Sequence, residues 1–197
     1  VVLVSDAGTP AISDPGFRLI RAARAAGIEV TVLPGPVAAV LALVGSGLPT
    51  DRWTFAGFPS TRRKARTNLL EELHAAGATA VLYESPRRVV DLLSDVADVY
   101  GEVQVCVARE LTKLHEEWWT GTAGEVSDAL AARDRLRGEF VVVVGSGEVR
   151  ERSDDVDRWL ASLIDAGVKP STIKQIASDA SGLSKSEIWD RMERLKS

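Results

Sequence analysis

The chain has 197 residues, 45% of them hydrophobic and 26% charged, a balance that excludes a disordered chain. Its longest apolar run is far shorter than the roughly 18 residues of a membrane-spanning helix, which excludes a transmembrane protein. One cysteine, Cys106, excludes a disulfide scaffold and a cysteine-based zinc site, and with only two histidines we expect no metal. Because the net charge is −4, any surface for nucleic acid must be local.

The first fifty residues alternate between strand-like and helix-like segments. Asp14 followed by Pro15 has the pattern of a helix N-cap with proline in the first turn, and Gly27 is a natural stop for that helix. The expected strands are 1–4 and 28–33, and the expected helices are 14–27 and 37–44. Glycine and proline over 45–49 predict a first domain boundary, so that 1–50 form the remainder of an N-terminal domain.

From residue 51 to 148 the alternation continues, which predicts a second α/β domain. The expected strands are 53–58, 79–83, 103–108, 117–120 and 140–144, and the expected helices are 61–76, 85–101 and 122–135. Thr122 to Glu125 has the spacing of a capping box. Phe140 to Val144 has the composition of a strand covered on both faces.

Beyond residue 153 no strand is expected, and we predict a small helical domain over 153–197. Its expected helices are 155–165, 171–180 and 185–195, the last opened by a second capping box at Ser184 to Glu187. The last two resemble a helix-turn-helix, although ordinary helical hairpins share that spacing. At its other end the chain begins at Val1 rather than at methionine, inside a strand-like segment. We therefore expect a piece of a longer protein whose front is missing.

Four loops that follow predicted strands have unusual composition, and ligands of open α/β sheets bind beyond the carboxyl ends of strands. These loops are 5–10, 34–38, 83–88 and 109–113. Glycine and alanine in the first two let the backbone approach a ligand, which suits an adenosine-like molecule. Glu84, Arg87, Glu110 and Lys113 in the other two could move a proton or hold a phosphate. Plain turns and solvated ion pairs remain the alternative interpretation of each loop taken alone.

Four blocks in this order carry a specific resemblance. They are SDAGTPAISDPG at 5–16, LPGP at 33–36, YESPRR at 83–88 and ARELTK at 108–113. Together they resemble the small-subunit ribosomal RNA methyltransferases of the tetrapyrrole methylase fold family, and the resemblance runs from residue 1 to the C-terminus. It implies an α/β fold of two domains with S-adenosylmethionine in the cleft between them, the first domain being incomplete here.

The resemblance also implies an activity and partners. The family enzyme methylates the ribose 2′-hydroxyl of a cytidine in 16S ribosomal RNA, so that we expect a cytoplasmic homodimer whose partner is the small ribosomal subunit. One alternative keeps the fold but takes a tetrapyrrole of the precorrin type as acceptor. Gly8-Thr9-Pro10 stands where tetrapyrrole-modifying members carry Gly-Asp-Pro, which weighs against it. A second alternative is a non-catalytic RNA-binding fragment.

Residue roles follow from the matching positions. The resemblance implies cofactor contacts at Asp6, Ala7, Gly8, Thr9, Ile12, Val37, Ala38, Tyr83, Glu84, Leu111 and Thr112. The catalytic candidates are Glu84, Glu110 and Lys113, of which the two carboxylates could act as the base that a ribose hydroxyl needs. For phosphate contact we predict Arg62, Arg63, Lys64, Arg66 and Arg87, with a solvated helix face as the alternative for the basic run.

Overall fold

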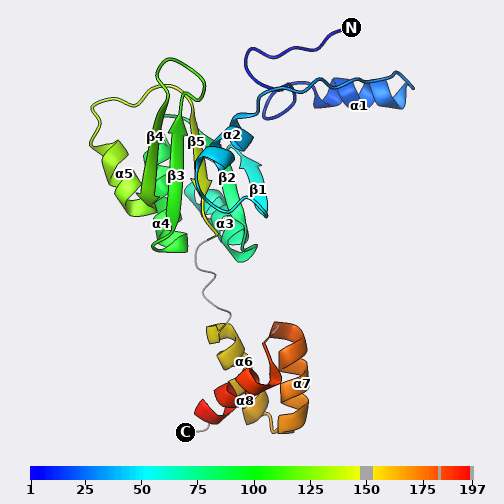
Figure 1. Cartoon of the computed structure of the whole chain (residues 1–197), viewed down its shortest axis with the longest axis vertical. Helices are drawn as coiled ribbons and strands as arrows, with labels where there is room; N and C mark the ends of the chain where they lie inside the picture. The colour runs from blue at the N-terminus through cyan, green and yellow to red at the C-terminus, as the bar shows by residue number, and fades with distance from the viewer. Residues whose placement is uncertain (147–152, 182, 196–197) are drawn as a thin grey trace. The chain divides into compact units, whose positions relative to one another are not determined.

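The structure is a computed structural model, and it describes residues 1–146, 153–181 and 183–195 (Figure 1). The chain divides into two compact units, Val1–Gly147 and Glu148–Ser197, which are described separately below. The fold class predicted from the sequence is confirmed, because a mixed α/β unit is followed by helices alone. None of the helices within the described ranges is long and apolar enough to cross a membrane.

A five-stranded sheet forms the centre of the first unit. Its strands are β1 (Trp53–Gly57), β2 (Thr79–Glu84), β3 (Gln104–Arg109), β4 (Glu117–Thr122) and β5 (Phe140–Val144). Their order in space is β1-β2-β5-β3-β4, with β1 and β2 parallel and every other neighbouring pair antiparallel. The ends of β1, β2 and β3 therefore meet the beginnings of β4 and β5 along one side, here named the carboxyl edge. All five strands predicted for this region are present.

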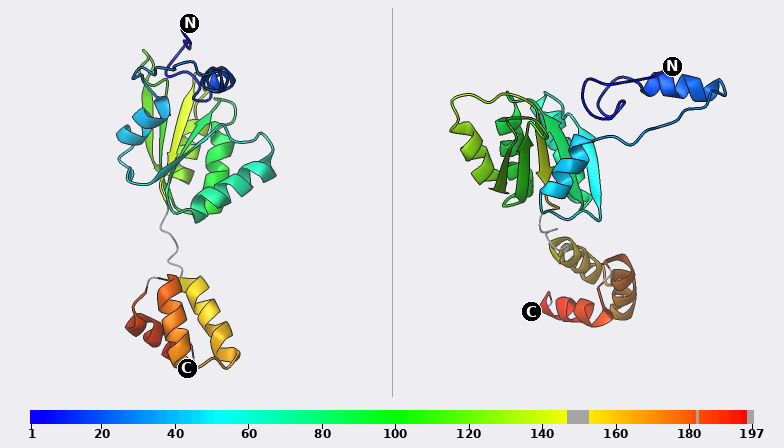
Figure 2. Two further views of the ribbon diagram at one scale, coloured as in Figure 1. Left: turned by 90° about the vertical axis from the view of Figure 1, so that its right-hand side faces the viewer. Right: turned by 45° about the horizontal axis from the view of Figure 1, so that its top comes forward.

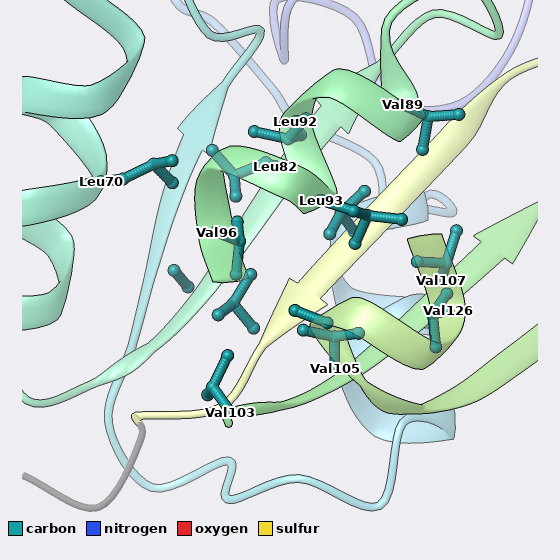
Figure 3. Packing of buried hydrophobic residues seen from close by; sticks show 14 of the residues in the cluster. Leu70, Leu82, Val89, Leu92, Leu93, Val96, Val103, Val105, Val107 and Val126 are labelled. Atoms are coloured by element: carbon teal, nitrogen blue, oxygen red, sulfur yellow. The ribbon is translucent and has the colours of Figure 1, made fainter. Parts of the chain in front are cut away.

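Helices cover both faces of this sheet (Figures 1 and 2). They are α2 (Ala38–Gly45), α3 (Arg63–Ala75), α4 (Val89–Tyr100) and α5 (Ala123–Ala131). Leucines and valines of α3, α4 and α5 form the larger core with one face, as Figure 3 shows for Leu70, Leu93 and Val126. Ala39, Ala42 and Leu43 of α2 pack on the other face. The site described below lies on the α2 side.

Strand β5 shows why composition predicted its position. Phe140, Val142 and Val144 point into the larger core, whereas Val141 and Val143 contact the α2 side. All five are buried. A strand with apolar side chains on both faces has no surface that tolerates water, so it occupies the middle of a sheet between two helical layers. The prediction that it is covered on both faces is confirmed.

Local end signals were also confirmed in this unit, although helix lengths differ. The Thr122 side chain accepts a hydrogen bond from Glu125 N–H at 3.3 Å, and the Glu125 carboxylate accepts one from Thr122 N–H at 2.9 Å. This capping box opens α5, which ends at Ala131 rather than at the predicted residue 135. The Cys106 thiol is buried in the smaller core, and burial raises its pKa to about 11.

The N-terminal segment departs from the prediction. Its helix, α1 (Phe17–Ala25), is present, but its N-cap is Gly16 rather than Asp14. The strands predicted over 1–4 and 28–33 are absent, and the prediction was wrong for both. Apolar, β-branched composition favours a strand only where a neighbour completes its hydrogen bonds. No strand of the described residues pairs with either segment, and side chains such as Leu33 are exposed.

The domain boundaries also differ in part. Residues 1–50 do not separate from the sheet, because α2 packs on it through Ala39 and Leu43 and the whole of Val1–Gly147 forms one unit. An apolar helix becomes part of the domain on which it packs. The glycine-rich turn that follows the helix does not indicate which domain that is. The division between the two compact units falls between Gly147 and Glu148.

The second unit contains three helices, as predicted. They are α6 (Ser153–Asp165), α7 (Pro170–Ser181) and α8 (Lys185–Arg194). Apolar side chains of all three form a small core, namely Val156, Leu160, Ile173, Ala177, Ile188 and Met192. Ser184 and Glu187 form the second capping box, with the Glu187 carboxylate accepting from Ser184 N–H at 2.8 Å. Lys174 Nζ lies 4.3 Å from the Trp189 ring centroid, a cation–π contact between α7 and α8.

Candidate functional site

Two of the predicted cofactor loops meet in the structure. Thr9 N–H donates a hydrogen bond to the Pro36 carbonyl at 3.0 Å, and the Thr9 hydroxyl donates to the same oxygen at 3.1 Å. Gly8 has a φ of +74°, and a Cβ there would lie only 3.2 Å from that oxygen. Glycine therefore permits both the left-handed backbone and the close approach of the two loops. Segments 27 residues apart in sequence are joined at this point.

The second loop leads into the N-terminus of α2. No side chain caps this helix, and Val37 is its N-cap residue. The Ala39 N–H donates a hydrogen bond to the Tyr83 hydroxyl at 3.1 Å, which connects α2 to the end of β2. Val37, Ala38, Tyr83 and Leu111 all pack against the smaller core. Four predicted cofactor contacts from three loops thus line one apolar wall, beside the first turn of α2.

Aromatic rings surround Tyr83. The Phe55 and Phe58 ring centroids lie 4.8 and 5.5 Å from that of Tyr83, with interplanar angles of 67° and 62°. Burial raises the pKa of the Tyr83 phenol, the hydrogen bond from Ala39 lowers it, and the Glu139 carboxylate raises it further. The phenol is therefore neutral at neutral pH, with an apolar face and one polar atom, as in many adenosine-binding surfaces.

Backbone strain is concentrated in two of the predicted loops. Within the described ranges, the non-glycine residues with positive φ are Ala11 (69°), Ser13 (54°), Glu110 (50°) and Thr112 (65°). The first two lie in the loop that carries Gly8, and the other two lie just after β3. Such conformations cost energy and persist where the surrounding contacts hold them, most often at functional sites. The strain is an observation independent of the sequence blocks, and it falls on the same loops.

Glu110 is held by contacts at the carboxyl edge. Its Oε1 accepts hydrogen bonds from Lys113 Nζ at 3.0 Å and from Glu139 N–H at 2.9 Å, and Lys113 Nζ also lies 2.8 Å from Glu139 Oε2. The hydrogen bond from Lys113 lowers the pKa of Glu110, and the one from Glu139 N–H lowers it further. A Cβ on Gly138 would lie 2.6 Å from the Glu110 side chain, so glycine makes room for it. Both hydrogen bonds fall on Oε1, and Glu110 Oε2 has no partner within the described chain.

Glu84 lies elsewhere. Successive strand residues point to opposite faces, so Tyr83 faces α2 while Glu84 follows Leu82 into the larger core. The Glu84 side chain is fully buried, and its Oε1 accepts hydrogen bonds from Ser85 N–H at 2.7 Å and pairs with Arg88 Nη2 at 2.6 Å. Its carboxylate stabilises the start of α4. The geometry therefore does not support the predicted base and cofactor roles of this side chain.

The predicted phosphate-binding residues fall into two groups. Arg66 is buried, and its guanidinium pairs with Asp95 at 2.6 Å, so the geometry does not support its predicted contact with RNA. Arg63 is exposed but pairs with Asp95 at 2.9 Å and with Asp98 at 2.8 Å. The exposed cations of this set that make no ion pair within the described residues are Arg62, Lys64 and Arg87. Arg62 precedes α3 and Arg87 precedes α4, near the carboxyl edge.

The remaining predicted contacts lie in the first loop. Asp6, Ala7 and Ile12 are exposed there, and Ala7 N–H donates to the Ser5 hydroxyl at 3.4 Å.

Sequence reasoning missed Gly138 and Glu139 because it considered only the loops that follow strands. These two precede β5, and the antiparallel direction of β5 brings them to the same edge. Among the described residues, no three His, Cys, Asp or Glu side chains are grouped so as to hold a metal ion.

The chemistry of these groups fits the predicted cofactor. An apolar wall with one tyrosine suits an adenine ring. Residues that would hold S-adenosylmethionine are the Gly8–Thr9 loop, Val37, Ala38, Tyr83 and Leu111. When bound, this cofactor supplies an electrophilic methyl group, so the protein needs mainly to bind and orient.

Comparisons with known proteins identify the family of the chain. The profile of the Tetrapyrrole (Corrin/Porphyrin) Methylases matches residues 1–127. The chain is 42% identical over 198 residues to "Ribosomal RNA small subunit methyltransferase I" of Mesorhizobium japonicum, covering 100% of this chain and 67% of the relative. It is 40% identical to the protein of the same name from Xylella fastidiosa, covering 96% and 70%. The chain thus spans about two thirds of the length of these relatives.

Solved structures show the same fold at low identity. The methyltransferase CobJ superimposes with a TM-score of 0.53 at 18% identity, over 70% of this chain and 61% of that one. Diphthine synthase gives a TM-score of 0.53 at 12% identity, over 70% and 57%. The fold, the paired cofactor loops and the profile match lead to one conclusion. The chain belongs to the tetrapyrrole (corrin/porphyrin) methylase family, a family of S-adenosylmethionine-dependent methyltransferases.

Proposed function

We propose that this chain belongs to an enzyme that transfers a methyl group from S-adenosylmethionine to the ribose 2′-hydroxyl of a cytidine in 16S ribosomal RNA. One observation carries the substrate class: relatives that match nearly the whole chain at 40–42% identity are named ribosomal RNA small subunit methyltransferases. The junction of the Thr9 and Pro36 loops beside Tyr83 supports the cofactor part of the proposal.

Glu110 is the residue that we propose to polarise the acceptor hydroxyl. A ribose hydroxyl is a weak nucleophile until a base accepts or attracts its proton. The contacts of Lys113 and Glu139 with Oε1 keep the carboxylate ionised and fix its direction, while Oε2 stays available as an acceptor. Because its pKa is lowered, Glu110 is better suited to orienting the hydroxyl by a hydrogen bond than to storing its proton. Lys113 acts through Glu110 and is a positioning residue.

The RNA is proposed to lie along the carboxyl edge. Arg62 and Arg87 lie there and form no ion pair with any described residue, so each can donate hydrogen bonds to a phosphate without breaking such a pair. The three-helix unit at the C-terminus is proposed as a second RNA contact. A homodimer remains a prediction, which sedimentation equilibrium of the purified chain would test.

The test has two parts. Titration calorimetry of the purified chain with S-adenosylmethionine is expected to show one site, and labelled methyl transfer to small ribosomal subunits is expected to appear in the RNA. Glu110→Gln should retain cofactor binding and lower the transfer rate roughly a hundredfold or more, the usual contribution of a positioned acid–base group. The matched change Arg87→Gln, outside the carboxylate contacts, should instead weaken RNA binding.

Other outcomes separate the alternatives. Transfer of label to an added tetrapyrrole, with none in RNA, would contradict the proposal and favour the precorrin-type reaction. RNA binding without any cofactor binding would favour a non-catalytic RNA-binding module. An unchanged transfer rate in Glu110→Gln would remove Glu110 from the proposed role.

A further inference from the structure

Helix α1 carries a row of three arginines that the sequence analysis did not single out. Arg18, Arg21 and Arg24 stand at three-residue intervals, and residues three apart are neighbours on one helix face. All three are exposed. The half-buried residues of this helix are Ile20 and Ala23, and Ile20 lies one turn before Arg24. The three arginines therefore form a continuous exposed row along the helix, whose last member borders the half-buried side.

No carboxylate neutralises this stripe. Helix α1 contains no acidic residue, and none of its arginines forms an ion pair within the described residues. The Arg21 guanidinium instead lies 5.4 Å from the Phe17 ring centroid, a contact that holds it without neutralising it. Other arginines of the same unit, such as Arg66 and Arg109, are paired with carboxylates. Like charges at this spacing repel one another, and an anionic partner would remove that cost.

We propose that Arg18, Arg21 and Arg24 bind consecutive phosphates of the RNA substrate. The inference rests on the proposed function and adds a contact surface to it. A guanidinium presents a planar pair of N–H donors that matches phosphate oxygens, and three in a row suit a chain of anions better than a single one. The loop of Gly8 and Thr9 leads directly into this helix, so the stripe is connected by a few residues to the cofactor loops.

The arginines of α1 are better placed to bind phosphate than the basic run at 62–66, because part of that run is already paired with a carboxylate. That run is denser in sequence, but Arg63 and Arg66 are engaged by Asp95. The α1 arginines are fewer, yet every one of them is available. Phosphate binding depends on the cations that are not already neutralised, so the less conspicuous segment is the better candidate.

The experiment compares three forms of the full chain. Anisotropy of a labelled single-stranded fragment of 16S ribosomal RNA would be measured from low to high salt. The triple variant R18Q/R21Q/R24Q removes the charges, and R18K/R21K/R24K preserves them as the matched control. Each lost phosphate contact lowers the slope of log K against log salt by about 0.7 for single strands, so the glutamine variant should lose about 2 and the lysine variant almost nothing. The calorimetric affinity for S-adenosylmethionine should be that of the unchanged chain in both.

Each other outcome has one meaning. An unchanged slope in the glutamine variant, with normal RNA binding by the original chain, would overturn the stripe and leave the proposed function intact. No salt-dependent RNA binding by the original chain would contradict the proposed function itself. If the glutamine variant lost binding to phosphatidylserine vesicles while its RNA binding was unaffected, the proposal would be overturned in favour of a lipid surface. The helical content of the glutamine variant is compared by circular dichroism with that of the lysine variant, because both variants lack the arginine side chains.

Discussion

The Tyr83 hydroxyl accepts a hydrogen bond from Ala39 N–H, and this one contact ties the end of β2 to the first turn of α2. Ala39 is buried, so its N–H has no access to water if the acceptor is removed. We therefore expect Tyr83→Phe to lower the free energy of unfolding by about 1–3 kcal/mol, the cost of an unsatisfied buried donor. Urea unfolding measures this, and calorimetry should show weaker binding of S-adenosylmethionine.

The chain offers a matched control for that substitution. Tyr100 is its other tyrosine, and the Tyr100 hydroxyl is buried with no hydrogen-bond partner among the described residues. Tyr100→Phe removes an unsatisfied polar atom and should leave the stability unchanged or raise it. Equal losses of unfolding free energy in the two variants would mean that the hydrogen bond from Ala39 N–H to the Tyr83 hydroxyl adds nothing to stability.

Gly138 is expected to be required for the observed position of the Glu110 side chain. A Cβ on Gly138 would lie 2.6 Å from the Glu110 carboxyl group, and the residue has a φ of +88°. Gly138→Ala should therefore destabilise the fold and weaken cofactor binding by displacing the loop of Leu111 and Thr112. Gly101→Ala is the control, since Gly101 has a φ of +70° and open space around its Cβ position.

The difference between these two alanine variants isolates the steric effect. A positive φ is unfavourable for a residue with a Cβ, and both variants bear a cost of this kind. We expect a larger loss at Gly138, together with a loss of S-adenosylmethionine affinity that Gly101→Ala does not show. Equal stability and equal affinity in the two variants would contradict the clash.

Elements with strong local signals were predictable from the sequence. The capping boxes at Thr122 and Ser184 depend on residues three apart, and the apolar run of β5 is buried wherever it lies. Strand order was not predictable, because the pairing of Ala80 with Val144 joins residues that no local pattern relates. For the same reason the strands predicted over 1–4 and 28–33 were wrong, since a strand needs a neighbour that its own residues do not encode.

The structure brings together several of the loops that follow strands, but helix periodicity was not applied to the basic run at 62–66. Arg66 was grouped with its basic neighbours in sequence, yet it is four residues before Leu70 and seven before Leu73, both of which are buried. That spacing places Arg66 on the inner face of α3, and it could have been recognised. Glu139 required the direction of β5, which only the sheet reveals.

Asp95 is expected to be one of the most sensitive polar positions. It is buried on α4 and pairs with the buried Arg66, so Asp95→Asn leaves a guanidinium without its counter-charge. Breaking such a pair from one side costs about 3–5 kcal/mol. The control is Asp98→Asn, since Asp98 is exposed and pairs with the exposed Arg63. The unfolding midpoint of this variant in urea should match that of the unchanged chain. A small effect of Asp95→Asn would show that Arg66 reaches water in the folded chain.

Stability should depend on pH through the Glu110–Lys113 pair. The pKa of Glu110 is lowered by its hydrogen bond from Lys113, so its stabilising contribution is complete above about 4.3, the ordinary glutamate value, and is lost as the pH falls through the folded-state pKa. The pKa of Lys113 is raised by Glu139 and Glu110, so its contribution is complete below about 10.4 and is lost as the pH rises beyond that. Between these limits the pair holds the loop of Leu111 and Thr112.

Urea unfolding of the chain and of Glu110→Gln, measured from pH 3 to 8, tests the acidic side of this window. The glutamine variant keeps the shape of the side chain but cannot titrate. The difference in unfolding free energy between the two proteins should therefore be constant above about pH 5 and should shrink as Glu110 is protonated at lower pH. A difference that is the same at every pH would mean that the Glu110 carboxyl group has the same pKa in the folded and unfolded chains, and that its contacts with Lys113 and Glu139 do not depend on its charge.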